Sequence, residues 1–174
     1  MSTNRIARAL GMSTGTLYYH FRNKEEIIRV LFERLSSDLD SVYVPPAKRA
    51  PDLTDLDGVL RGHLQTLWHY RFIYREIAAL AQRDPELRTQ YCRQSTRGHK
   101  YLVELINALI REGILRKPEG QGTVTELAHA WRVVAEFWLP FMELARAHMG
   151  GRALDEGVGM LHRVIRPHLR RVDP

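Results

Sequence analysis

The segment GMSTGTLYYHFRNKEE, residues 11–26, constrains the fold more than any other part of the chain. Ser13 or Thr14 is placed to cap a short helix, because either hydroxyl can accept a hydrogen bond from a free backbone N–H group. Asn23, with Glu26 three residues later, is typical of the start of another helix. A preceding short helix, a tight turn and these two helices together predict a helix-turn-helix. In that motif the second helix enters the DNA major groove.

Composition narrows the class of protein. The chain has 174 residues, and 44% of them are hydrophobic, which is enough for a packed core. No window reaches the roughly 20 apolar residues of a membrane span, and no secretory leader pattern opens the sequence. The single cysteine, Cys92, cannot form an intramolecular disulfide. We therefore expect a cytoplasmic location and no membrane partner. The net charge of +6 favours a polyanionic partner.

Hydrophobic spacing predicts helices almost throughout, so the expected fold class is all-α. A short helix over residues 3–10 precedes the turn, and a long helix follows over residues 24–43. The proline-rich segment 44–51 ends that helix. We place the domain boundary there. Residues 1–43 would form the helix-turn-helix region with its connecting helix, and residues 52–174 a larger helical domain.

Capping signals mark the helices of the larger domain. After a leucine-lined helix, the chain is expected to change direction near His69 and Tyr70 and to continue in one helix that carries Ile73, Ile77 and Leu80. Asp84 and Pro85 are typical of the next helix start, since aspartate caps and proline fits the first helical position. Thr123 with Glu126 predicts a further capping box.

Proline should distort the last two helices of the chain. Pro140 is expected to bend the helix that follows Thr123. The final helix is predicted over residues 154–172, with a kink at Pro167.

The segment TNRIARALGMSTGTLYYHFRNKEEIIRVL, residues 3–31, resembles the DNA-binding region of the tetracycline-repressor (TetR) family of bacterial regulators. The pattern G-x-S-x-x-x-L-Y-x-H-F-x-N-K-E-E carries this resemblance. It implies a homodimer with two small DNA-binding domains, a larger domain that binds a small-molecule effector, and dimerisation through the last two long helices. It further implies a transcriptional regulator, expected to be a repressor that the effector releases from a palindromic operator.

The resemblance assigns base reading to the first part of the short helix. Thr14 and Thr16 can hydrogen-bond a base or touch a thymine methyl group, and Tyr18 lies beside them. Gly15 has no side chain to read a base, so it would permit close backbone approach.

Phosphate contacts are expected mainly from Tyr19, His20 and Lys24. Lys24 also lies at a helix N-terminus, where free N–H groups favour an anion. Thr3 and Asn4 match further DNA-contact positions of the family. Without the motif around them, the two tyrosines of the short helix would fit core packing equally well.

The beginning of the chain departs from the family pattern. Family members have a helix ahead of the one that starts at Thr3, and it completes a three-helix core. Without that helix Ile6, Leu10, Leu17 and Phe21, which we expect to form the small core, lose cover worth roughly 1.5–3 kcal/mol each. We expect a trimmed copy of a longer protein; the alternative is an impaired DNA-binding domain.

The larger domain is expected to hold the effector. Aromatic side chains would line an apolar cavity, and a histidine or a glutamine one turn after Tyr91 would supply a polar contact. Ordinary core packing is the alternative for each aromatic residue. The candidates are His63, Leu67, Trp68, Tyr91, Gln94, Trp131 and Trp138.

Two apolar stripes in the last two helices predict a two-fold homodimer, because exposed they would exceed the patches usual on monomers. The stripes are formed by Phe137, Phe141 and Leu144 on one helix and by Leu161, Ile165 and Leu169 on the next.

An enzyme is the rival class. Glu126 and His129 form a Glu-x-x-His pair on one helix face, but a di-metal bundle needs two such pairs and two additional glutamates. No second pair exists, and the histidines form no His-Glu-x-x-His motif. We therefore expect no enzymatic activity, no metal and no cofactor. The remaining alternative is a helical homodimer that binds a ligand or partner without binding DNA.

Overall fold

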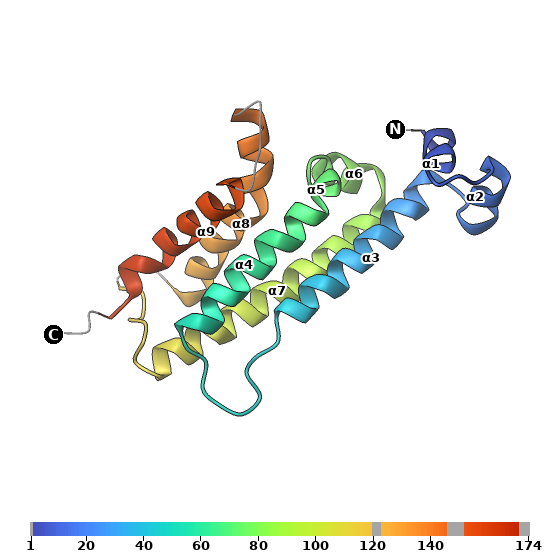
Figure 1. Ribbon diagram of the computed structural model, residues 1–174. Helices are drawn as coiled ribbons and strands as arrows, with labels where there is room; N and C mark the ends of the chain where they lie inside the picture. The colour runs from blue at the N-terminus through green and yellow to red at the C-terminus, as the bar shows by residue number, and fades with distance from the viewer. Residues whose placement is uncertain (1, 120–122, 146–151, 171–174) are drawn as a thin grey trace.

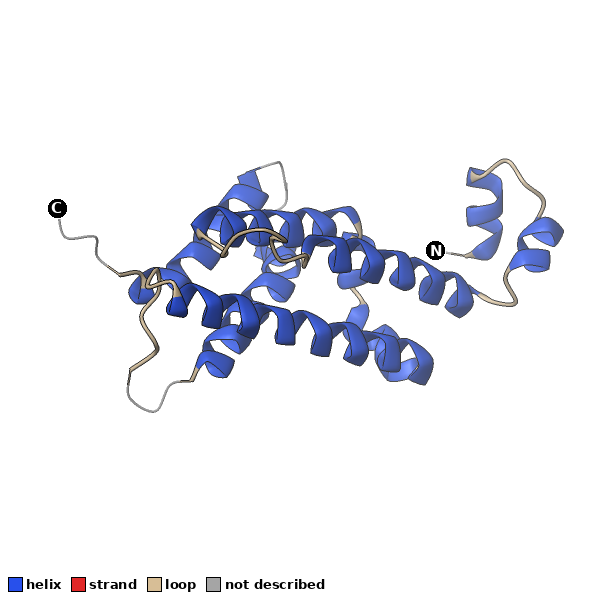
Figure 2. Ribbon diagram, turned by 90° about the horizontal axis from the view of Figure 1, so that it is seen from below, coloured by secondary structure: helices blue, strands red, loops and turns tan. Residues whose placement is uncertain are grey.

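The computed structural model describes residues 2–119, 123–145 and 152–170 of the chain. These residues form helices and no strand beyond one isolated β-bridge, which confirms the predicted all-α class. Figure 1 shows a helical body from which a short helix pair, α1 and α2, projects at one end. The end of the last helix, α9, lies at the opposite end in both views (Figures 1 and 2). No described helix is long and apolar enough to cross a membrane.

The first three helices follow the predicted order. Helix α1 spans Thr3–Ala9, α2 spans Thr14–His20 and α3 spans Lys24–Val42. The loop after α3 contains the proline-rich segment, as the sequence predicts. Only the first turns of α3 extend toward the helix pair, and the rest of α3 packs against helices of the body (Figure 1).

The body consists of α4 to α9 and a terminal 3₁₀ turn. Side chains cap the starts of α4, α7 and α8. Asp52 and Asp55 form a reciprocal capping box at α4. The Asp84 carboxylate accepts the backbone N–H groups of Glu86 and Leu87 at α7, and Thr123 and Glu126 form the capping box of α8. The bounds are α4 Leu53–His69, α5 Arg71–Tyr74, α6 Ile77–Arg83, α7 Pro85–Arg111, α8 Val124–Ala145, α9 Arg152–Ile165 and η1 Arg166–His168.

Two helix predictions for the body were wrong in detail. The single helix expected near Ile73 is divided into α5 and α6, because the Glu76 N–H donates to the Ile73 carbonyl three residues earlier and tightens the turn. The final α-helix ends at Ile165 and is not merely kinked at Pro167, which lies in η1. Proline has no N–H to continue the helix, and it disfavours helical geometry in the residue before it. Val172 lies outside the described residues.

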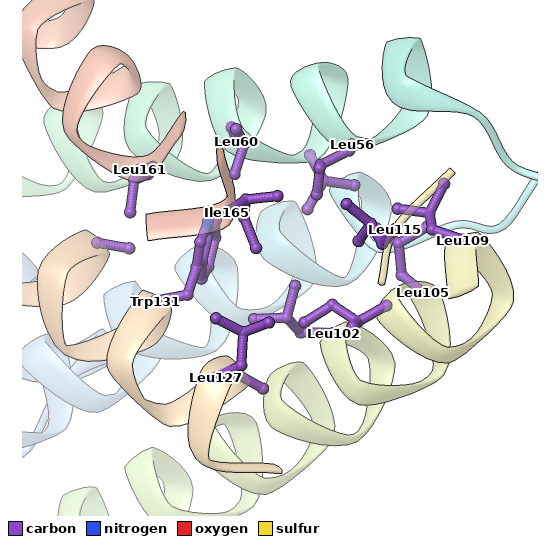
Figure 3. Packing of buried hydrophobic residues seen from close by; sticks show 14 of the residues in the cluster. Leu56, Leu60, Leu102, Leu105, Leu109, Leu115, Leu127, Trp131, Leu161 and Ile165 are labelled. Atoms are coloured by element: carbon purple, nitrogen blue, oxygen red, sulfur yellow. The ribbon is translucent and has the colours of Figure 1, made fainter. Parts of the chain in front are cut away.

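The main hydrophobic core fills the space between α4, α7, α8 and α9 (Figure 3). Leu60, Leu109 and Trp131 are among its fully enclosed side chains. Leu161 and Ile165 also point into this core, with 0% and 2% of their surface exposed. Their assignment to a dimer stripe was therefore wrong, since α9 uses this apolar face to cover its own protomer.

A second core cluster joins α3 to the body. Phe32, Leu35 and Leu39 of α3 are completely buried and pack with Tyr74 and Leu87. Ion pairs reinforce the outer edge of this contact, including Arg29 with Asp84 at 2.8 Å. The connecting helix is thus a structural member of the larger body as well as the link to α1 and α2.

Candidate nucleic-acid interface and effector site

The turn between α1 and α2 depends on glycine. Gly11 has φ +66°, a left-handed conformation that other residues adopt only with strain. Its N–H donates to the Arg8 carbonyl at 3.2 Å, and the Met12 N–H donates to the Ala7 carbonyl at 3.1 Å. This is the Schellman arrangement, which ends a helix and redirects the chain. It sets the angle at which α2 leaves α1.

Ser13 caps α2. Its Oγ accepts the Thr16 N–H at 3.0 Å and also lies 2.8 Å from the Thr16 hydroxyl. Of the two caps that the sequence allows, the structure uses the serine. The same contacts fix the Thr16 side chain at the exposed first turn of α2, while Gly15 is exposed beside it.

The aromatic residues of α2 face outward. Tyr18 and Tyr19 are 48% and 86% exposed, so the alternative of core packing does not describe them. The Tyr18 hydroxyl shares a hydrogen bond with Thr3 Oγ1 at 3.0 Å, which joins the second half of α2 to the start of α1. The Tyr19 ring meets His20 edge-on at 5.2 Å.

The remaining DNA-contact candidates lie around this surface. Asn4, like His20, is exposed, whereas Thr14 and Lys24 are half-buried. Lys24 is the first residue of α3, directly after the cap Asn23, whose Oδ1 accepts the Glu26 N–H at 2.8 Å.

The small core between α1 and α2 differs from the prediction. Ala7 and Leu17 are buried, while Ile6 and Phe21 are half-buried. Leu10 is 61% exposed, so its assignment to this core was wrong: it caps the end of α1 on the outer side. Ala7 was missed because a small side chain gives little signal in a hydrophobic pattern.

Three of the ligand candidates are buried in the interior of the body. His63, Gln94 and Trp131 are each at most 2% exposed. The buried atoms His63 Nε2, Gln94 Nε2 and Trp131 Nε1 have no hydrogen-bond partner among the described residues. The His63 and Trp131 rings lie 5.4 Å apart. Buried polar atoms are normally paired, so this unpaired group stands out from the surrounding core.

Tyr43, at the end of α3, completes the polar interior. Its hydroxyl shares a hydrogen bond with His63 Nδ1, and the two rings are stacked. Burial lowers the pKa of His63 to about 3, so the imidazole is neutral at physiological pH. Burial also raises the pKa of Tyr43 and keeps its hydroxyl protonated. The sequence offered no signal for this contact, because it joins α3 to α4.

An open pocket of about 340 Å³ lies between α7 and α8, next to this interior. Arg132 and Glu136, an ion pair one helical turn apart on α8, are both buried and line it. The Tyr91 hydroxyl donates to Glu136 Oε2 at 2.5 Å. Burial, followed by the Glu136 charge, raises the pKa of Tyr91. Sequence reasoning identified Tyr91 but missed the ion pair; two opposite charges within the apolar face of a predicted helix were the available signal.

Two histidines form the pocket's rim. His99 of α7 and His129 of α8 stack with their centroids 4.1 Å apart. Burial lowers the pKa of His99, and the neighbouring charges of His129 and Arg132 lower it further.

The other ligand candidates lie apart from the polar interior. Leu67 belongs to the second core cluster. The Arg71 guanidinium lies over the Trp68 ring, 4.7 Å from the ring centroid. Trp138 Nε1 donates to the Ala153 carbonyl at 2.8 Å and borders a different hollow beside α9. An effector contact from these three residues stays a prediction.

Known proteins similar to this chain share both parts of the structure. Residues 1–31 match the family described as "Bacterial regulatory proteins, tetR family", and residues 34–172 match the TetR family described as "Bacterial transcriptional repressor". The nucleoid occlusion factor SlmA of Haemophilus ducreyi is 38% identical over 56 residues, which are 32% of this chain and 27% of SlmA. The match thus spans little more than a quarter of that relative's length.

Solved structures extend the similarity to nearly the whole chain. A TetR-family transcriptional regulator from Marinobacter aquaeolei VT8 is 29% identical, with a TM-score of 0.87 over 98% of this chain and 81% of that one. The ketosteroid transcriptional regulator KstR2 of Mycobacterium tuberculosis shares the fold at 20% identity, with a TM-score of 0.71 and coverage of 98% and 86%. With its helix-turn-helix and its helical body both matched, the chain belongs to the TetR family of bacterial transcriptional regulators.

Proposed function

We propose that the protein is a ligand-responsive repressor that binds a palindromic operator as a homodimer and leaves it when a small-molecule effector binds. The observation that carries the DNA-binding part is the outward face of α2. Thr16, Tyr18 and Tyr19 project from a helix held at the tip of the molecule by the Gly11 turn. A recognition helix needs this placement, because its first residues must reach base edges in the major groove.

Chemistry divides the interface into two parts. The threonines and Tyr18 are suited to base edges, whereas Tyr19, His20 and Lys24 are suited to phosphates. Lys24 combines a positive charge with the N-terminus of α3, which favours an anion.

The outer face of α8 supports the homodimer. Val133, Phe137, Phe141 and Leu144 are between 52% and 91% exposed and follow helical spacing along one face. We call these four residues the α8 stripe. A second copy of the chain is the occupant we propose, because a two-fold axis lays the same apolar stripe against itself. The two recognition helices of such a pair would then face the two half-sites of a palindrome.

The unpaired interior atoms support an effector site in the body. Each buried donor without a partner costs about 1–3 kcal/mol, and an effector with acceptor oxygens would pair with Gln94 and Trp131. The pocket between α7 and α8 is lined by sequence neighbours of these residues, and it shares Val133 and Phe137 with the α8 stripe, so an effector bound there would also touch the proposed dimer contact. Arg132 is already neutralised by Glu136, so the site does not require a charged effector.

Tyr43 links this site to the DNA-binding helices. It ends α3, whose other end carries α2, and it contacts His63 directly. An effector that alters the His63 contact acts on α3. Release from the operator requires the effector to prefer one spacing of the two recognition helices.

Selection of duplexes from a random pool tests the DNA-binding part. We expect enrichment of a palindrome with half-sites about one helical turn apart or a little more. A pool that stays unenriched, with a stable dimer in solution, would favour the alternative of a ligand-binding homodimer without DNA binding.

Thermal-shift screening followed by operator titration tests the effector part. A compound that binds should lower operator affinity, and Gln94→Leu should abolish its effect while DNA binding remains. Gln65→Leu, at an exposed position of α4, is the control. Equal binding of the compound to the free and the operator-bound dimer would contradict the proposed coupling.

A further inference from the structure

Four arginines line one hollow at the end of the body opposite the helix-turn-helix. The hollow measures about 540 Å³, and its lining residues are Arg116, Arg163, Arg166, Pro167, Leu169 and Arg170. We call it the arginine hollow. In Figure 1 it corresponds to the end of α9, drawn in red, and the chain that follows α7, drawn in yellow. The site is therefore separate from both the DNA interface and the polar interior.

Backbone hydrogen bonds hold two of these arginines in place. The Arg116 N–H donates to the His168 carbonyl at 2.6 Å, and the Arg170 N–H donates to the Ile114 carbonyl at 3.1 Å. Between them Leu115 and Leu169 form an antiparallel bridge, and Leu115 is completely buried. The two segments are thus fixed side by side, so the backbone positions of Arg116 and Arg170 are set before any anion binds.

The charges in the hollow lack carboxylate partners within the described residues, Glu156 apart. Elsewhere the chain pairs its arginines: Arg49 with Asp55 at 2.6 Å and Arg97 with Asp40 at 3.0 Å are examples. Apart from Glu156, no described acidic residue forms an ion pair with any of the four hollow arginines.

Most of the guanidinium donors in the hollow also face no described acceptor. Arg116 Nη2 donates to the Leu169 carbonyl at 3.4 Å, and Arg163 Nη1 lies 3.4 Å from Met160 Sδ. Each guanidinium carries five N–H donors. All four arginines are exposed, so solvent screens part of their mutual repulsion, and an anion bound between them would remove what remains.

The side-chain type indicates which anion fits. Every cation that lines the hollow is arginine, whose planar fork matches phosphate oxygens with two parallel hydrogen bonds. A single phosphate group carries at most about two negative charges near neutral pH, so it would neutralise only part of the charge of the four arginines. We propose that the arginine hollow binds a small anion with two or more linked phosphate groups. The anion bridges the segment around Arg116 and the segment from Arg163 to Arg170.

Binding of pyrophosphate to the full chain tests this site. Isothermal titration at constant ionic strength compares the wild type with the double variant Arg116→Gln and Arg170→Gln, which leaves the backbone bridge unchanged. The control is Arg88→Gln with Arg93→Gln, two exposed arginines of α7 outside the hollow. We expect the hollow variant to bind pyrophosphate at least about tenfold more weakly and the control to match the wild type. Equal weakening in both variants would show only general charge attraction and overturn the proposal.

Thermal unfolding without added anion gives a second readout. At low salt the hollow variant should have a higher Tm than the wild type, because two repelling charges are removed, and pyrophosphate should stabilise only the wild type and the control. A lower Tm in the hollow variant would mean that these arginines hold the fold, which contradicts the proposal. Binding of a random DNA duplex is measured in parallel. If the hollow variant loses duplex binding but not pyrophosphate binding, the hollow belongs to nucleic acid and the small-anion site is refuted.

Discussion

The Tyr43 hydroxyl and His63 Nδ1 share a hydrogen bond, and their rings are stacked with centroids 5.9 Å apart. Gly98 of α7 lies against the same tyrosine, where a Cβ atom would be 3.0 Å from Tyr43 Cε2. The contact therefore fastens the end of α3 to α4 and α7 together. This contact requires His63 to be uncharged in the interior, so the stability of the fold depends on pH.

Acid should destabilise the protein through His63. Its folded pKa of about 3 lies below the ordinary value of 6.5. Only the unfolded state therefore binds a proton between these values, so the free energy of unfolding falls as pH drops below about 6.5. We expect a loss of about 2 kcal/mol from this residue between pH 7 and pH 5, measured by urea unfolding.

The His63→Gln variant is the control for this effect. Glutamine does not titrate, so the difference between pH 7 and pH 5 should shrink by the contribution of His63. His99→Gln should reduce the same difference, because the pKa of His99 is also lowered. Unchanged pH dependence in His63→Gln would contradict the assignment of the acid effect to this histidine.

The same substitution should have opposite effects at two glycines. Gly11→Ala should destabilise the α1–α2 unit by about 1–2 kcal/mol, because φ +66° is strained for a residue with a Cβ. Gly58→Ala should stabilise the body by about 0.5–1 kcal/mol, since Gly58 lies inside α4 with open space around it. Urea unfolding followed by circular dichroism measures both, with operator binding as a readout for Gly11. Equal effects at the two positions would refute the conformational argument.

Lys24 and Thr16 should affect DNA binding differently. Lys24→Ala should weaken binding to operator and to scrambled duplex alike and lower the salt dependence by about one counterion per subunit, because phosphates are the same on every sequence. Thr16→Ala should weaken operator binding selectively, by about 1–3 kcal/mol per half-site if it contacts a base. Salt-titrated binding to both duplexes distinguishes the two roles. Selective loss from Lys24→Ala together with uniform loss from Thr16→Ala would reverse them.

The α8 stripe should control assembly. Phe141→Lys should convert the dimer to a monomer, because a charge replaces an apolar side chain at the proposed two-fold contact. Val44→Lys is the control: Val44 is 65% exposed and lies in the loop between α3 and α4. Sedimentation equilibrium at micromolar protein measures both variants. A wild type that sediments only as a monomer would contradict the proposed dimer itself.

Local signals predicted the helix starts well. Asn23, Asp84 and the Thr123–Glu126 pair all cap the helices expected from them. These interactions involve residues at most three positions apart, so the sequence contains both partners. Pro167 was equally visible, but a proline can either kink a helix or end it, and the surrounding sequence does not distinguish the two.

Long-range packing was harder to predict. The periodicity of α9 shows that Leu161 and Ile165 share an apolar face, but not whether the same protomer or a partner covers it. The unpaired interior was only partly foreseen: His63 and Gln94 were candidates because of their residue type. Tyr43 was not a candidate, because the residues it contacts lie on helices far away in the sequence. No local sequence pattern predicts such a contact.

The exposed α8 stripe carries a consequence for gene control. If the stripe must be paired before two recognition helices can engage one operator, operator occupancy in dilute solution rises with the square of the subunit concentration. Halving the number of copies in the cell would then reduce occupancy about fourfold while dimers are scarce, by mass action. The strength of one apolar contact would thus set the copy number at which repression begins.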